Sequence, residues 1–327
     1  MSASTMTSRA DVSPASLAQR ISAYDPQPRD AKTLGRARAA VITAFGRTLS
    51  GAPASITMAL RAIPGIAMTG GSSLVFGTER RTGAVDAALI NATAAVAGSG
   101  ASPDAANGAF VVSLFGLCEE RGKTGQEFID ALMAGADISR SLAPAASPSA
   151  GPLGPALLGS VAAAARLLEL SRPKIAAALL MAGVANAGNP AVGQGGAGAL
   201  MVGQCLSNGL LATLLAEAID EASCHEMIGS EQRSAGDGLP EKEVFDLLAV
   251  RSPPGVDLWD QFDQHAGVVL PRDDVAPLFE RLETIEKVKD LATVSRLLQG
   301  RGPRAAPKKV VFAPRGAHEP EETNWVP

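Results

Sequence analysis

Apolar side chains recur along most of the chain at the three- and four-residue spacing that places them on one face of a helix. Period-two alternation of β-branched residues, the pattern of strands, is nearly absent before residue 300. The sequence therefore predicts a mainly α protein. The expected helices are, in chain order, Leu17–Tyr24, Asp30–Leu49, Ser55–Ile63, Gly83–Ala97, Ser102–Gly122, Thr124–Arg140, Leu153–Leu170, Pro173–Ala187, Ala199–Ala222 and Asp274–Leu298.

Two of these helices carry start signals. Ser102 followed by Pro103 is typical of an N-cap and a first helical position. Thr124 and Glu127 have the spacing of a capping box, in which each side chain satisfies the backbone amide of the other residue. These two signals predict that one helix begins at Ser102–Pro103 and another at Thr124.

Small side chains shape the expected core. Aromatic residues make up 4% of the sequence and hydrophobic residues 46%, and alanine and glycine are abundant. The distance between packed helices depends on the side chains at their contact. We therefore expect a large core in which helix backbones approach closely.

Charge and cysteine content exclude several classes of protein. The net charge of -4 gives no basic excess, so nucleic acid is not an expected partner. Three cysteines without a CxxC pair argue against a disulfide framework and favour a reducing compartment, so we expect a cytoplasmic protein. These cysteines are Cys118, Cys205 and Cys224.

One uncharged stretch, between Lys174 and Glu217, has the composition of a membrane span. Asn186, Pro190 and the glycines of residues 193–198 interrupt it, and the flanking pieces are too short for about 30 Å of hydrocarbon. We therefore expect no spanning helix. The glycine run also lacks the spacing of a phosphate-binding loop and is interpreted as a connection between helices.

Six strings, in the same order along the chain, resemble motifs of the MmgE/PrpD family. Residues 87–95 (AALINATAA) are similar to its Asn-Gly helix, residues 159–171 (GSVAAAARLLELS) to its alanine-rich helix, and residues 208–216 (NGLLATLLA) to its NGLxAAxLA helix. The other three are residues 41–52, 128–140 and 285–298. The resemblance extends over roughly Leu17–Leu298.

The resemblance implies an all-helical core domain with a smaller lid, arranged as a homodimer. Members include 2-methylcitrate dehydratase, cis-aconitate decarboxylase and iminodisuccinate epimerase, which act on small polycarboxylates without a metal, so no cofactor is expected. We expect a flexible N-terminus (1–15), a helical core (16–222), a reduced lid remnant (223–270), C-terminal helices returning to the core (271–299) and a disordered tail (300–327). Within the lid remnant only Lys242–Leu248 is predicted to be helical.

The sequence departs from the family where the resemblance places the active site. Small or apolar residues replace acids, histidines and a lysine in the strings that correspond to AHALDFDD (95–102), HPG (106–108), FHPT (147–154) and K-x-L-H-x-G (198–203). Ser99, Asp104 and Asn107 remain as catalytic candidates. The expected substrate-binding residues are Ser99, Ser102, Asn107, Ala150, Gly198 and Met201.

Each of these candidates also has a structural interpretation. Ser102 is explained equally well as an N-cap, and Asp104 as a first-turn acid that the helix dipole favours. Burial of a polycarboxylate without compensating cations would be prohibitive. We therefore expect a neutral, more apolar pocket that suits a less charged substrate.

Three further groups of polar residues have ordinary explanations: Cys224-His225-Glu226, Asp263 with His265, and Asp137 with Arg140. The first could bind a metal only with additional ligands, which do not follow at suitable spacing, and is interpreted as exposed residues at a helix end. The second could bring a base to a pocket from the lid remnant, but a surface position is favoured. The third has the spacing of a surface ion pair on one helix.

Three functional hypotheses follow. The first is a diverged enzyme of lyase or isomerase type that acts on a small, less charged organic substrate. The second is a non-catalytic paralogue that binds a small molecule or stabilises an active family member as a heterodimer. The third is a structural homodimer whose tail (301–327) recruits a partner.

Overall fold

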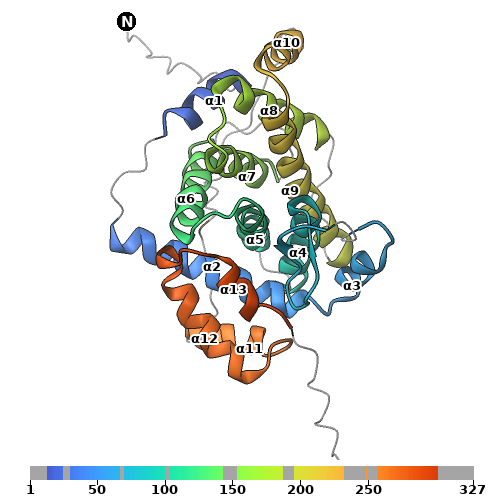
Figure 1. The fold of residues 1–327 in the computed structure, drawn as a ribbon, viewed down its shortest axis with the longest axis vertical. Helices are drawn as coiled ribbons and strands as arrows, with labels where there is room; N and C mark the ends of the chain where they lie inside the picture. The colour runs from blue at the N-terminus through green and yellow to red at the C-terminus, as the bar shows by residue number, and fades with distance from the viewer. Residues whose placement is uncertain are drawn as a thin grey trace, which may run out of the picture.

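The computed structural model describes residues 13–24, 30–66, 70–100, 104–142, 153–186, 195–231, 248 and 256–300. This part of the chain consists of helices and one short hairpin (Figure 1). The prediction of a mainly α fold is confirmed. The elements are α1 Pro14–Ser22, α2 Ala31–Gly51, α3 Ser55–Ala62, β1 Ser73–Leu74, β2 Arg81–Thr82, α4 Ala84–Ala97, α5 Ala105–Glu120, α6 Gly125–Leu142, α7 Gly154–Leu167, α8 Arg172–Ala185, α9 Gly195–Ala218, α10 Glu221–Glu231, α11 Leu258–Ala266, α12 Arg272–Glu283, the 3-10 turn η3 Ile285–Lys287 and α13 Ala292–Leu297.

Helix α5 lies at the centre of the molecule, surrounded by α2, α4, α6, α7 and α9 (Figure 1). Its residues are apolar on nearly every side, and those from Asn107 to Cys118 are all buried. A helix that is hydrophobic all round cannot leave a face in water, so it becomes the core of the bundle.

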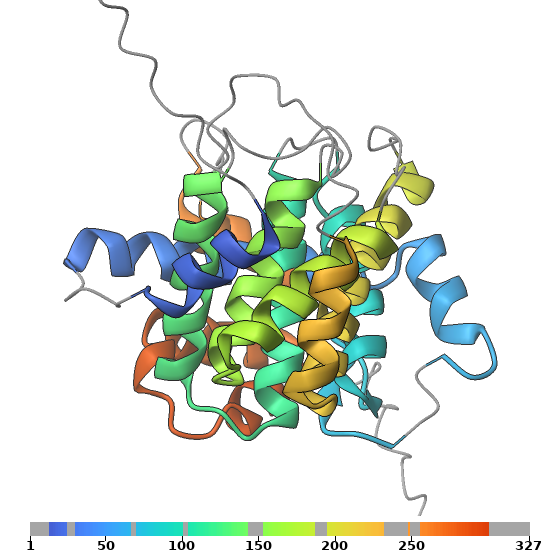
Figure 2. The same cartoon turned by 90° about the horizontal axis from the view of Figure 1, so that it is seen from above.

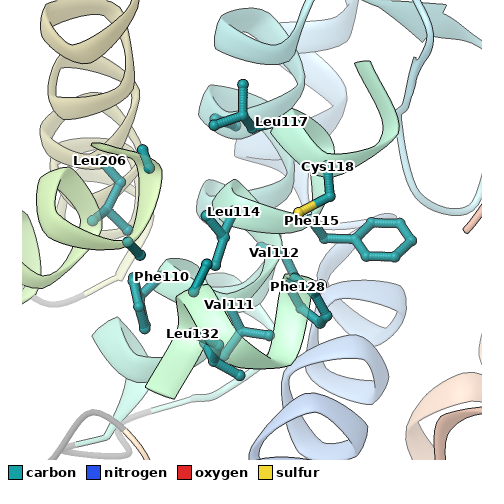
Figure 3. Close-up of a cluster of buried hydrophobic side chains, with 14 of the residues drawn as sticks. Phe110, Val111, Val112, Leu114, Phe115, Leu117, Cys118, Phe128, Leu132 and Leu206 are labelled. Atoms are coloured by element: carbon teal, nitrogen blue, oxygen red, sulfur yellow. The ribbon is translucent and has the colours of Figure 1, made fainter. Parts of the chain in front are cut away.

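The aromatic residues gather around this central helix. Phe115 packs edge-on against Phe45 of α2 and Phe128 of α6, with ring centroids 4.9 and 5.7 Å apart. Figure 3 shows Phe110 on α5 and Phe128 approaching from α6, and a Cβ on Gly135 of α6 would lie 2.9 Å from the Phe110 ring. A small number of aromatic residues thus fills the space where several helices meet. Edge-on aromatic pairs of this kind stabilise the fold by more than the burial of their surface area alone would.

Glycines bring helix backbones together elsewhere, as the composition predicts. A Cβ on Gly135 of α6 would lie 2.4 Å from the carbonyl oxygen of Gly159 in α7. A Cβ on Gly203 of α9 would lie 2.2 Å from the hydroxyl of Thr93 in α4. Since real Cβ contacts are longer, these two crossings require glycine.

The hairpin β1–β2 is fastened to the bundle by polar side chains. Asn91 of α4 accepts from the amide of Phe76 at 3.0 Å and donates to the carbonyl of Leu74 at 2.8 Å. Glu120 of α5 accepts from the amide of Ala84 at 2.7 Å and so satisfies an orphan donor at the start of α4. The asparagine of the 87–95 string therefore has a structural role.

The predicted helix starts are confirmed in part. Thr124 and Glu127 form the capping box, with the Thr124 amide donating to Glu127 at 2.8 Å and the Glu127 amide donating to Thr124 at 3.2 Å. The start predicted at Ser102 is wrong. Helix α5 begins at Ala105, with Asp104 at the N-cap position, and Ser102 lies outside the described residues.

The weakly patterned region contains two helices that the sequence analysis missed, α10 and α11. Both are short, and α10 has no strong apolar face, so the three- and four-residue spacing is faint there. The prediction at Lys242–Leu248 lies outside the described residues except for Leu248, which is buried. The single helical region predicted over Asp274–Leu298 is divided into α12, η3 and α13.

Helix α9 is the one helix of the described residues that is long and apolar enough to cross a membrane, judged by length and composition. Of its most apolar window, 61% is buried inside the protein. It packs against α4, α7 and α8. Burial against three neighbours accounts for its apolar composition as a core helix.

Helices α11 and α12 complete the molecule by packing on α2 (Figure 1). Phe262 and Ala266 of α11 and Leu278 of α12 belong to the same buried cluster as the α5 residues. The C-terminal part of the described chain therefore shares one hydrophobic core with the preceding helices.

Candidate functional site

Helices α4 to α9 run alternately up and down, since α4 packs on α5, α6 on α7 and α8 on α9. As a result α4, α6 and α8 end, and α5, α7 and α9 begin, at one end of the bundle, the upper edge of Figure 2. We call this the α4–α5 end. It carries the sequence candidates Ser99, Asp104, Asn107, Gly198 and Met201. The other two, Ser102 and Ala150, lie outside the described residues.

Ser99 lies in the turn that follows α4. Its hydroxyl donates to the carbonyl of Ala95 at 2.6 Å. The preceding residue, Gly98, is packed so closely on α2 that a Cβ would lie 1.9 Å from the carbonyl oxygen of Arg47. This contact fixes the end of α4 on α2 and so positions the Ser99 turn.

Asp104 occupies the N-cap position of α5 rather than its first turn, and its carboxylate makes no capping hydrogen bond. Instead it forms an ion pair with Arg47 of α2, with the guanidinium nitrogen 3.2 Å from the carboxylate oxygen. The two side chains are only 10% and 6% exposed. A buried pair of this kind is held by mutual attraction and is costly to separate.

Asn107 lies one turn into α5 and is 8% exposed. Together with Thr43, Arg47 and Asp104 it lines a cavity of about 10 Å³. A space of this size accommodates about one water molecule and no organic ligand. The described residues around Asn107 therefore form a closely packed polar cluster.

His265 joins this cluster from α11. It lies against α2, where a Cβ on Gly46 would approach the His265 side chain to 3.3 Å, and it lines a second cavity of about 10 Å³ with Thr43. Burial, followed by the positive charge of Arg47, lowers the pKa of His265 below its ordinary value. The surface position favoured for His265 is wrong because this residue is half-buried, whereas Asp263 is exposed.

Gly198 and Met201 occupy the first two turns of α9. Gly198 is buried and Met201 is partly exposed. Gly203 contacts Thr93 and Leu89 on the antiparallel α4, and at 1.5 Å per residue Gly198 lies about 7 Å further towards the end of α4. The two α9 candidates therefore share the α4–α5 end with Ser99, although no hydrogen bond joins them to it among the described residues.

Cys224, His225 and Glu226 lie inside α10 rather than at a helix end, and the prediction that all three are exposed is wrong for Cys224. Cys224 is buried and burial raises the pKa of its thiol, whereas His225 and Glu226 point into solvent. Asp137 and Arg140 form an exposed ion pair at 3.1 Å, and Asp137 also accepts from the Tyr24 hydroxyl at 2.8 Å. The surface prediction for this pair did not include the hydrogen bond to Tyr24, which follows the end of α1.

Within the described residues no three His, Cys, Asp or Glu side chains come together in a way that could hold a metal ion. The chemical groups gathered near the α4–α5 end are instead an internally neutralised arginine, a histidine with a lowered pKa, hydroxyls and an amide. Arg47 was missed in the sequence analysis because its partner lies far away along the chain. Such an arrangement can orient a small molecule by hydrogen bonds but offers little net positive charge.

Comparison with curated proteins finds no match to the chain. The family model of the MmgE/PrpD N-terminal domain matches residues 15–223, from α1 into α10 and including every described candidate residue at the α4–α5 end. The match covers well over half of the sequence, and it contains five of the six motif strings; the sixth, residues 285–298, lies beyond it. The chain therefore belongs to the MmgE/PrpD family.

Proposed function

We propose that this protein acts on a small organic molecule of low charge at the α4–α5 end, in a reaction of lyase or isomerase type. The observation that carries the proposal is the ion pair between Arg47 and Asp104. The arginine that could attract an anionic substrate here is already neutralised by a carboxylate of the protein itself.

Electrostatics supports this choice of substrate class. A polycarboxylate that leaves water loses several kcal/mol of hydration for each charge, and only paired cations recover it. Arg47 is paired with Asp104, and the lowered pKa of His265 favours the uncharged form of its side chain. Gly198 and Met201, where the family motif has a lysine and a histidine, are uncharged.

Residues at this end could still position a substrate. Ser99 keeps acceptor lone pairs while its hydroxyl donates to Ala95, and Asn107 can both donate and accept. Asp104 would serve as the acid or base only if a ligand displaced Arg47. Orientation of a bound molecule by such groups can lower a barrier without strong acid or base catalysis.

A thermal-shift panel tests the substrate class. Neutral and singly charged analogues of small hydroxy and unsaturated acids should raise the melting temperature, and di- and tricarboxylates should not. Strong stabilisation by citrate-like acids would contradict the electrostatic argument.

Variants then test the site. Once a turned-over compound is found, Ser99→Ala with Asn107→Ala should reduce kcat/KM at least tenfold. The matched control, Ser223→Ala on the exposed surface of α10, should leave it unchanged. Turnover that survives substitution of Ser99, Asp104 and Asn107 together would place the chemistry elsewhere.

A second candidate function is a non-catalytic subunit that stabilises an active member of the family as a heterodimer. The close packing around Asn107, with cavities of about 10 Å³, favours it because no ligand fits there without rearrangement. Co-expression with an active family member should then yield a mixed complex of higher thermal stability. Recovery of the two chains as separate species would rule this function out.

A further inference from the structure

A groove runs between α12, η3 and α13, on the side of the molecule opposite α1 and α8 (Figure 1). Its volume is about 770 Å³, far larger than the cavities near Asp104. Pro277, Val288 and Leu297 are its apolar lining residues, of which Val288 is buried; we call them the apolar floor. The groove therefore has room for several side chains of a peptide segment.

Positive charge lines this groove. Arg281, Lys287 and Arg296 are exposed on its walls and form no ion pair with the described residues, while Glu280 is the one acid that lines it. Nearby, Arg38 is satisfied by Glu286 at 2.6 Å. The groove thus combines unneutralised cations with an apolar floor, which suits a segment that carries acids next to large apolar side chains.

The last residues of the chain have this composition. Glu319, Glu321 and Glu322 are followed closely by Trp325 and Val326. They are joined to Gly300, only three residues after Leu297, which itself lines the groove. At up to about 3.5 Å per residue, the chain between Gly300 and Glu319 is long enough to return to the groove.

We propose that the segment Glu319–Pro327, which lies outside the described residues, docks in the α12–α13 groove of its own chain. The glutamates pair with Arg281, Lys287 and Arg296, and Trp325 covers the apolar floor. The intervening residues 301–318 contain only cations among their fully charged side chains, so the groove selects the acidic end of the tail over the part before it. Attachment to the same chain gives the segment a high effective concentration at the groove.

Distance measurements between two spin labels test this docking in the full chain. The labels are placed at Ala276→Cys, on the exposed surface of α12 beside the groove, and at Asn324→Cys. The native cysteines are buried and will not compete for the label. Docking predicts a narrow distribution at short distance.

Charge reversal provides the decisive variants. Arg281→Glu with Arg296→Glu should abolish the narrow peak, and so should Glu321→Lys with Glu322→Lys, which changes no described residue. The four substitutions combined should restore it. The matched control, Arg20→Glu with Arg172→Glu on α1 and α8, should leave the peak intact.

Three results would overturn the proposal. The first is a broad distribution in the unsubstituted chain, and the second is a peak that both reversals leave unchanged. The third is a short distance that disappears when labelled protein is mixed with excess unlabelled protein, because the tail would then dock on a second copy.

Discussion

The ion pair between Arg47 and Asp104 joins two helices that lie far apart in sequence. Both side chains are nearly excluded from water, so each has lost most of its hydration. Their attraction compensates for this loss only while both are present. The pair therefore makes the α4–α5 end sensitive to the loss of either partner, which an exposed pair would not do.

Removal of one partner should thus destabilise the protein strongly. We expect Arg47→Ala or Asp104→Ala to lower the free energy of unfolding by about 3–5 kcal/mol, because an uncompensated charge stays buried. Arg47→Met combined with Asp104→Leu should recover most of the loss. Urea denaturation measures all three, and Arg140→Ala, which breaks the exposed pair with Asp137, should cost only about 0–1 kcal/mol. Equal effects at the two pairs would contradict the burial argument.

Gly203 lies where α9 crosses α4, in contact with Thr93. The Thr93 hydroxyl that faces Gly203 cannot swing away freely, because it donates to the carbonyl of Leu89 at 2.8 Å. A methyl group at position 203 would therefore push the two helices apart. The strings 87–95 and 208–216 belong to these helices, so their small residues serve packing.

Gly203→Ala should accordingly lower the free energy of unfolding by about 1–3 kcal/mol through overpacking. Gly183→Ala is the matched control: this glycine is also inside a helix, but its Cβ would meet nothing within 4 Å. Since alanine is the better helix former, the control should raise stability by about 0.5–1 kcal/mol. Thermal or urea unfolding of both variants distinguishes the outcomes, and a neutral Gly203→Ala would show that the crossing is loose.

At the scale of elements, Glu119 ties three of them together. From the C-terminal part of α5 its carboxylate accepts from the amide of Leu74 in β1 at 3.0 Å, from Arg81 of β2 at 3.1 Å and from the Ser295 hydroxyl of α13. Burial raises the pKa of Glu119 in spite of these donors. The hairpin and the last helix are thus held by an acid that the folded state prefers to protonate.

This preference has a consequence for stability against pH. Because the folded pKa lies above the ordinary value of 4.5, the contribution of Glu119 is full below that value and is lost as pH rises through the folded pKa. The free energy of unfolding of the wild type should therefore fall relative to Glu119→Gln across this window and run parallel to it outside. Urea titrations at a series of pH values measure the difference.

Ser295→Ala provides the internal check, since it removes a hydrogen bond that lowers the pKa of Glu119. Without that donor the pH range over which the stability contribution of Glu119 is lost should extend to higher pH. Curves for wild type and Glu119→Gln that stay parallel from pH 4 to 8 would exclude this origin of the pH dependence.

At the scale of the molecule, one hydrophobic core joins the family-matched helices to the C-terminal ones. Trp259 of α11 packs edge-on against Phe279 of α12 at 5.0 Å, and Phe262 beside it reaches the core around α2. The described part of the expected lid remnant thus packs with the bundle. Elements that share a core usually unfold in one transition.

A Trp325→Phe variant tests whether α11 to α13 unfold together with the bundle, because Trp259 then remains as the single tryptophan. Its fluorescence and the far-ultraviolet circular dichroism should change with the same midpoint in urea. An earlier fluorescence transition would mean that α11 to α13 form a separate, weaker unit.

Much of the fold follows from local pattern. The apolar spacing located α2 and α6 to within a few residues, and the capping box at Thr124 was confirmed because both partners are neighbours on the chain. Helix α10 was missed because it has no strong apolar face, and α11 because it is only nine residues long and lies in a stretch rich in charged residues, glycine and proline.

The candidate site depended more on tertiary structure. The sequence by itself determined the family and the helical class, because motif order and helix periodicity are properties of the chain. Only the tertiary structure paired Arg47 with Asp104 and brought His265 against α2, since these partners are distant in sequence and meet through helix packing. Local patterns specify elements, while the charge balance of a buried site is decided by which elements meet.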